Sequence, residues 1–223
     1  MNGRVVSVQV GRAGLLAYRG KPVSSAFRKQ PVDGPVALNE TGLHGDEQAD
    51  RTNHGGPDMA LSFYAAENQR ELSQRLGLDL EPGAFGENVT TEGFLETDVM
   101  IGDVLRIGDT AVIQVSTPRG PCYKISARHG VRELPAILAL ELKAGFLARV
   151  VEPGPIEAGD AIELLERRSE ISVAETLRVY YRDRGDDEAI AAVAAVPELA
   201  ARTANELRSR RDRRALTVED FAP

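Results

Sequence analysis

One sequence pattern decides the fold class and occurs twice: IGDVLRI at residues 101–107 and AGDAIEL at residues 158–164. Each copy places a Gly-Asp turn before a strand in which apolar residues alternate with other residues. Other runs with the β-branched and aromatic content of half-buried strands lie at residues 5–10, 60–64 and 111–115. Short strands that change direction at glycine suit a closed sheet. We therefore expect residues 1–167 to form a mainly β, barrel-like domain with a few helices.

Two helices are predicted within this β-rich part. The first covers residues 66–76, and Gly77 follows it where a left-handed C-terminal cap belongs. The second covers residues 131–144 and is rich in leucine. Its start should lie near Glu133, because Pro135 is tolerated only in the first turn of a helix.

Residues 168–223 differ in character, being rich in alanine and arginine, and predict a small three-helix region. SVAE at residues 172–175 has the form of a capping box that starts the first helix. Asp186 and Asp187 can cap the second helix, and Pro197 suits the first position of the third. Because such short helices are marginal alone, we expect this tail to pack on the barrel.

Composition narrows the classes of function and location. Of 223 residues, 42% are hydrophobic and 27% are charged, which is ordinary for a globular protein. The net charge of -7 argues against a dedicated nucleic-acid binder. The arginines between residues 208 and 214 could contact nucleic acid, but in an acidic chain a solvated helix face, or a helix C-terminus complemented by positive charge, explains them better. No signal-peptide pattern or membrane-length apolar run is present, so we expect a cytoplasmic protein without a membrane partner.

The only cysteine, Cys122, lies in one of three polar, glycine-containing loops. Prolines stiffen its loop, and Arg119 and Lys124 would favour the thiolate, which is the metal-binding form of the side chain. A lone cysteine is more often an inert buried residue, so both interpretations stay open from this chemistry alone. The three loops are GDEQADRTNHGG at residues 45–56, FGENVTTEG at residues 85–93 and TPRGPCYK at residues 117–124.

His54, Gly55 and Gly56 end the first loop. The two glycines could expose consecutive N–H groups to an anion, or they could simply form the turn before the next strand. His54 has no second histidine or cysteine at the spacing of zinc ligands. A zinc site is therefore not expected.

The second loop offers a candidate pocket wall. Phe85 could line a pocket while Asn88 and Thr90 hydrogen-bond a polar planar ligand, or the latter two could merely close a turn. The chain has no phosphate-binding P-loop, no dinucleotide-binding glycine fingerprint and no nucleophile elbow. Nucleotide-cofactor and serine-hydrolase functions therefore lack support, and pyridoxal phosphate binding is not expected.

Taken in order, the three loops resemble the signature blocks of MOSC domains, a family named for the C-terminal domain of molybdenum-cofactor sulfurases. The segment GFLARV at residues 145–150, with the Pro-Gly and Gly-Asp pairs at residues 153–154 and 159–160, resembles the closing strands of that domain. The tail resembles that of bacterial YiiM-type proteins, so the resemblance covers nearly the whole chain. One departure is Tyr123, where phenylalanine or tryptophan is commoner in the family.

The resemblance implies a β-barrel-like fold that holds the molybdenum cofactor, molybdopterin, with Cys122 as the metal ligand. It also implies reduction of N-hydroxylated bases such as 6-N-hydroxylaminopurine. A thiolate is a soft ligand that suits a metal already bound by dithiolene sulfur. Because the chain has no iron–sulfur cysteine cluster and no flavin fingerprint, electrons should come from a separate reductase.

Further roles follow as expectations from this resemblance. Glu87 and Asp46 are the first candidates for an acid that donates protons, although either could be a structural cap. Arg119, Lys124 and Arg128 are candidates to bind the pterin phosphate through charge-assisted hydrogen bonds.

Two questions stay open at this point. A competing hypothesis makes the chain a sulfur carrier or cofactor-binding module, with a persulfide on Cys122 in place of a bound metal. The tail could cover the barrel, support a homodimer, or present a docking surface to the reductase.

Overall fold

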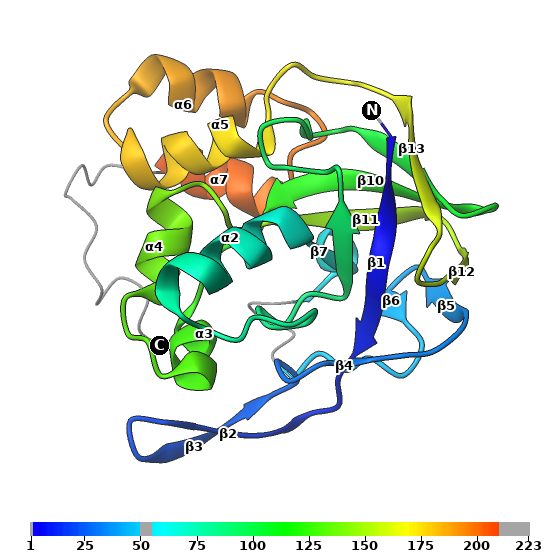
Figure 1. Ribbon diagram of the computed structural model, residues 1–223. Helices are drawn as coiled ribbons and strands as arrows, with labels where there is room; N and C mark the ends of the chain where they lie inside the picture. Colours follow the sequence, from blue (N-terminus) through cyan, green and yellow to red (C-terminus); the bar gives the residue numbers. More distant parts are fainter. Residues whose placement is uncertain (1, 50–54, 210–223) are drawn as a thin grey trace.

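The computed structural model describes residues 2–49 and 55–209 of the chain. Seven strands form a closed barrel in the order β13-β9-β10-β11-β7-β8-β1, and β1 pairs with β13 to close it (Figure 1). All neighbouring pairs are antiparallel except β7 and β8, which are parallel. The barrel strands are β1 (Asn2–Val10), β7 (Leu61–Ala65), β8 (Val89–Glu92), β9 (Val104–Ile107), β10 (Ala111–Pro118), β11 (Phe146–Glu152) and β13 (Ala161–Glu166).

The repeated Gly-Asp pattern produces two strands that are neighbours in this barrel. β9 and β13 follow the Gly-Asp pairs of the two copies and pair with each other, with Ile107 opposite Ile162. Both isoleucines are fully buried, as alternation predicts for the inward face. The expected mainly β, barrel-like domain is therefore confirmed.

Short strands lie outside the barrel. β2 (Gly14–Tyr18) and β3 (Lys21–Ser25) form a hairpin that projects from it (Figure 1). β4 (Gln30–Pro31) pairs with the end of β1. A separate three-stranded sheet contains β5 (Val36–Asn39), β6 (Gly42–Leu43) and β12 (Gly154–Ile156).

The first predicted helix is confirmed and the second is shorter than expected. α2 (Ala66–Leu76) has the predicted bounds, and Gly77 caps it in the left-handed conformation. The helix expected over residues 131–144 is only α4 (Leu134–Leu140). Its extension is wrong because Leu142 has a φ of 61°, which a right-handed helix does not allow. Two further helical segments, η1 (Pro57–Met59) and α3 (Tyr123–His129), were not predicted.

The tail forms α5 (Val173–Leu177), a π-helical turn η2 (Arg178–Arg182), α6 (Asp187–Ala194) and α7 (Ala201–Ser209). Two predicted caps are confirmed: Ser172 accepts a hydrogen bond from the backbone of Glu175, and Asp186 caps α6. The predicted start of the third helix at Pro197 is wrong. α7 begins at Ala201, after a turn in which the Ala200 N–H donates to the Ser116 carbonyl of β10 at 2.8 Å.

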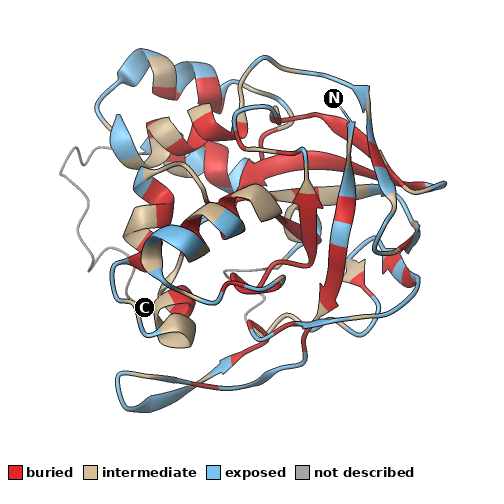
Figure 2. Cartoon of the chain, in the orientation of Figure 1, coloured by how far each residue is buried: buried red, intermediate tan, exposed pale blue. Residues whose placement is uncertain are grey.

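One apolar core joins the barrel to the tail. Figure 2 shows buried residues both in the barrel strands and in the helices of the tail. Phe63 and Ile113 from the barrel belong to the same buried cluster as Leu177 and Leu207 from α5 and α7. The tail therefore packs on the barrel, as expected. A second cluster lies beneath α2, α3 and α4 and includes Tyr64, Leu72, Phe85, Ile125 and Leu138.

Strand β10 contributes to the first cluster and α3 to the second. The segment that joins them, residues 119–122, contains the cysteine. Each end of this segment is thus anchored in a packed core. Within the described part of the chain, no helix has the length and apolar content required to span a membrane.

Candidate functional site

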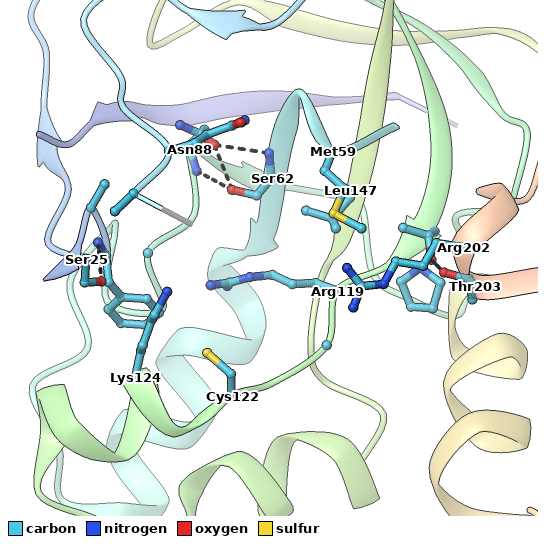
Figure 3. Close-up of a pocket in the computed structure, with 18 of the residues that line it drawn as sticks. Ser25, Met59, Ser62, Asn88, Arg119, Cys122, Lys124, Leu147, Arg202 and Thr203 are labelled. Atoms are coloured by element: carbon cyan, nitrogen blue, oxygen red, sulfur yellow. Dashed lines mark hydrogen bonds between the residues drawn. The ribbon is translucent and has the colours of Figure 1, made fainter. Parts of the chain in front are cut away.

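A cavity of about 290 Å³ opens where β10 leads into α3. Its described walls come from the segment after β3, the first and second polar loops, η1, β7, the end of β10, the start of α3, β11 and the tail. Figure 3 shows part of this lining. Among the described residues, four cationic and three anionic side chains line it. The cations are Lys29, Arg119, Lys124 and Arg202, and the anions are Asp46, Glu47 and Glu206.

Cys122 lies at the wall of this cavity with a free, half-buried thiol. Its backbone is extended, and its carbonyl accepts a hydrogen bond from Ile125 that starts α3. The preceding loop is fixed by the Arg119 N–H, which donates to the Gly145 carbonyl at 3.0 Å. Figure 3 shows the side chains of Cys122, Arg119 and Lys124 converging on one part of the cavity.

Lys124 is a buried cation in this wall. Its ammonium group makes no hydrogen bond or ion pair with another described residue. The ammonium nitrogen is not among the fully buried atoms that lack a partner, so it is accessible from the cavity, where it can form a charge-assisted hydrogen bond with an anion.

Arg119 also lines the cavity, but its guanidinium is already engaged. It donates to the Phe85 carbonyl and lies over the Phe27 ring, 6.0 Å from the centroid. Burial lowers the pKa of the guanidinium, and the negative charge of Glu87 opposes that shift. Arg119 therefore bridges the second and third loops as well as adding positive charge.

Asp46 is in the cavity wall and holds several elements together. Its carboxylate accepts hydrogen bonds from the Gly11 N–H at 2.7 Å and from the Asn88 amide at 2.9 Å. It also forms a buried ion pair with Lys29, a residue that the sequence did not single out. Burial lowers the pKa of Lys29, and the neighbouring Asp46 carboxylate acts in the opposite direction.

Glu87 is fully buried and does not belong to the cavity wall. Its carboxylate accepts hydrogen bonds from the backbone N–H groups of Gly83 and Phe85, at 2.7 and 3.0 Å. Gln69 and Thr90 donate to it as well. This geometry is that of a structural cap, one of the two roles foreseen for Glu87. Thr90, also fully buried, belongs to the same network and not to the wall.

Asn88 reaches the cavity, but its amide is satisfied by protein groups. Its oxygen accepts from the Ser62 hydroxyl at 2.8 Å, and its nitrogen donates to Asp46. Phe85 is buried against Tyr64 and His129, with ring centroids 4.4 and 5.9 Å away, and is not in the wall.

The remaining candidates lie at the margin of the site or outside it. Gly55 and Gly56 precede η1 and are not in the wall, whereas Met59 from η1 is. His54 lies outside the described residues. Arg128 donates to the carbonyls of Phe27 and Gly83 at 3.3 and 2.7 Å, and does not line the cavity.

The tail supplies residues that sequence reasoning missed. These are Leu177 of α5, Tyr180 and Tyr181 of η2, and Arg202, Thr203 and Glu206 of α7. Their helical spacing predicts which residues share a face, but not which part of the barrel that face meets. No local signal in the sequence marks them as site residues.

Comparisons with known proteins agree with this fold. The MOSC domain family matches residues 50–163, and the family described as YiiM-like, 3-alpha helix domain matches residues 171–214. Protein YiiM of Escherichia coli is 40% identical over 188 residues, covering 82% of this chain and 81% of that protein. A protein named Reductase from Gibberella moniliformis is 36% identical over 173 residues, covering 74% of this chain and 30% of that protein. The crystal structure of YiiM from Geobacillus stearothermophilus superposes with a TM-score of 0.79 at 32% identity, covering 92% of this chain and 97% of that one.

Proposed function

Because this chain belongs to the MOSC family and carries a YiiM-like 3-alpha helix domain, we propose that it is a molybdenum-cofactor-dependent reductase of N-hydroxylated bases. Family membership supports a general oxidoreductase role of the molybdenum-cofactor type. The relative named Reductase supports the reductive direction. The observation that carries the proposal is that one cavity brings together a free thiol, Cys122, and the Lys124 side chain, whose ammonium has no charged partner among the described residues.

The donor set of the cavity fits a molybdopterin group. Cys122 offers a soft sulfur ligand for the metal, and Lys124 offers a positive charge for the anionic pterin phosphate. Arg119 adds a second cation beside the thiol. A volume of about 290 Å³ lies at the lower end of small-molecule sites. In this proposal Cys122 holds the metal while Lys124 and Arg119 hold the phosphate end.

Arg128 has a different role in this proposal. Its hydrogen bonds to the Phe27 and Gly83 carbonyls fix the segments that border the cavity. It therefore supports the walls and does not bind phosphate.

The reaction takes an N-hydroxylated base, R–NH–OH, two electrons and two protons to R–NH2 and water. The bound cofactor would supply the electron pair that breaks the N–O bond. The protein supplies the protons and a cavity that holds the base. Electrons reach the site from a separate reductase.

The ion pair of Lys29 and Asp46 is the group best placed to hold a proton in the wall. Lys29 Nζ is buried against the Asp46 carboxylate, and both residues line the cavity. Burial eases release of the Lys29 proton, since it lowers the pKa of the ammonium group. Asp46 was expected to take part in proton donation, and in this proposal it does so through Lys29. Glu87 is left with its structural role.

A reduction assay tests the function directly. Protein from a cofactor-competent host is supplied with a chemical electron donor and 6-N-hydroxylaminopurine, and the aminopurine product is measured. We expect turnover by the wild type and none by Cys122→Ser. Turnover by the variant would contradict the role of the thiol. A persulfide on Cys122 without bound molybdenum, seen by intact-mass spectrometry, would favour the sulfur-carrier alternative.

A further inference from the structure

The wall contributed by the tail is fixed relative to the cysteine loop. Thr203 of α7 and Thr117 of β10 share a buried hydrogen bond of 2.8 Å. The Ala200 N–H donates to the Ser116 carbonyl, and Arg149 of β11 donates to the Glu198 carbonyl at 3.0 Å. Through these bonds α7 is attached to strands of the barrel, so its cavity-facing side chains keep a defined position relative to Cys122.

Glu206 is the acidic side chain in this wall. One carboxylate oxygen accepts from Arg202 Nε at 2.9 Å, and the other accepts from the Tyr180 hydroxyl. A carboxylate has about four acceptor positions, so each oxygen keeps one further position for a donor. The side chain is 41% exposed, and it lines the cavity, so a ligand there can reach the carboxylate.

The hydrogen bond from the Tyr180 hydroxyl distinguishes this arrangement from an ordinary surface ion pair. An Arg–Glu pair four residues apart on an exposed helix face is only weakly stabilising and needs no further group. Here Tyr180 comes from η2, a different element, and holds the carboxylate from the other side. π-Helical turns occur frequently at functional sites. Glu206 is thus oriented by two elements of the tail.

We propose that Glu206 determines substrate specificity by accepting two hydrogen bonds from the amidine-type edge of an N-hydroxylated base. In its imino tautomer such a base presents the ring N–H and the hydroxyl of its N–OH group as two donors on one rigid edge, which match the two oxygens of one carboxylate. A simple alkylhydroxylamine has an N–H and an O–H on one freely rotating group, but no ring N–H fixed beside them. Tyr180 and Arg202 act as positioning residues, because they orient the carboxylate. This inference deepens the proposed function and rests on it for the identity of the substrate class.

A binding measurement tests the inference separately from turnover. Molybdenum-loaded wild type, Glu206→Gln and the matched control Glu188→Gln are compared by equilibrium dialysis. Glu188 is an exposed residue of α6 outside the cavity wall. The two probes are 6-N-hydroxylaminopurine and N-benzylhydroxylamine, without a reductant. Reduction kinetics with both probes, and thermal unfolding, are then measured on the same samples.

We expect Glu206→Gln to weaken binding of the purine at least about 10-fold, because one hydrogen bond to a charged group is lost. The KM for the purine should rise in parallel with little change in kcat. Binding of N-benzylhydroxylamine, and the control variant, should stay within about 2-fold of wild type. If the variant loses purine binding and the wild type binds the purine without reducing it, recognition by Glu206 is supported and only the reductase function is contradicted.

The other outcomes overturn the inference. Unchanged purine binding in Glu206→Gln would refute it and leave the reductase function standing if turnover persists. An equal loss for both probes, with a lower unfolding temperature, would assign Glu206 a structural role only. Failure of the wild type to bind the purine at all would contradict the inference and the proposed substrate class together.

Discussion

The hydroxyl oxygens of Thr117 and Thr203 lie 2.8 Å apart in the buried interface between β10 and α7. Thr117 is near the end of the strand that leads to Cys122, and Thr203 is in the last described helix. Together with the Ala200–Ser116 and Arg149–Glu198 hydrogen bonds, this contact joins the tail to the barrel beside the strand end that leads into the cysteine loop. The barrel and the tail are therefore expected to act as one unit around the cavity.

Replacing Thr203 with valine should destabilise the protein by about 1–2 kcal/mol. Valine has the same shape but leaves the buried Thr117 hydroxyl without this partner. The free energy of unfolding, measured by urea titration, checks the effect. The double variant Thr117→Val/Thr203→Val is the control, since removing both hydroxyls avoids an unsatisfied group and should recover part of the loss. A double variant that loses the sum of both single effects would argue against a direct bond.

Asp46→Asn should destabilise the protein by about 3 kcal/mol or more. The change leaves the buried Lys29 ammonium without its counter-charge, and uncompensated buried charges are costly. Urea unfolding at neutral pH measures the loss. Adding Lys29→Met to Asp46→Asn should recover much of it, because the unpaired charge is then gone.

The neighbouring Glu47→Gln is the matched control for this prediction. Glu47 accepts a hydrogen bond from the Ala13 N–H in an exposed position, so the expected loss is below about 1 kcal/mol. Equal losses of unfolding free energy in Asp46→Asn and Glu47→Gln would contradict the cost that we assign to leaving the buried Lys29 ammonium without a counter-charge.

His129 should make stability depend on pH below about 6.5. Burial lowers the pKa of this imidazole, so below pH 6.5 the unfolded state binds a proton that the folded state resists. The histidine-dependent part of the stability is therefore present above pH 6.5 and is lost as the pH falls toward the folded-state pKa. His129→Gln keeps a donor for the Ala84 carbonyl and removes the titration.

The free energy of unfolding of wild type should exceed that of His129→Gln by less at pH 5.5 than at pH 7.5. Because the ring is only partly buried, the change in this difference should be less than about 1 kcal/mol. Urea unfolding at both pH values measures the difference. A constant advantage, or one that grows on acidification, would contradict the direction given for the pKa of His129.

Much of the fold follows from local sequence signals. The Gly-Asp turns before β9 and β13, and Gly77 after α2, predict the elements that the structure contains. α3 was missed, although Gly130 caps it in the left-handed conformation, because its 7 residues are too few to show a helical period. Pro197 was assigned to a helix start, but its segment instead forms the turn whose Ala200 bonds to β10. That tertiary bond has no local signature.

The site was predictable only in part. Cys122 and Lys124 stand out because their loop is dense in proline and charge, and both line the cavity. Lys29 and Glu206 were missed, since their roles depend on segments far apart in sequence. The domain boundary expected between residues 167 and 168 stays a prediction, because barrel and tail share one apolar core.

Molybdenum content shows most directly whether Cys122 holds a metal. Wild type and Cys122→Ser are produced in a cofactor-competent host, and the metal is measured by elemental analysis together with circular dichroism to verify folding. The account predicts about one molybdenum per folded wild-type chain and almost none in the folded variant, because Cys122 is its only cysteine. Equal molybdenum in the two proteins, or none in either, would contradict a metal held by Cys122.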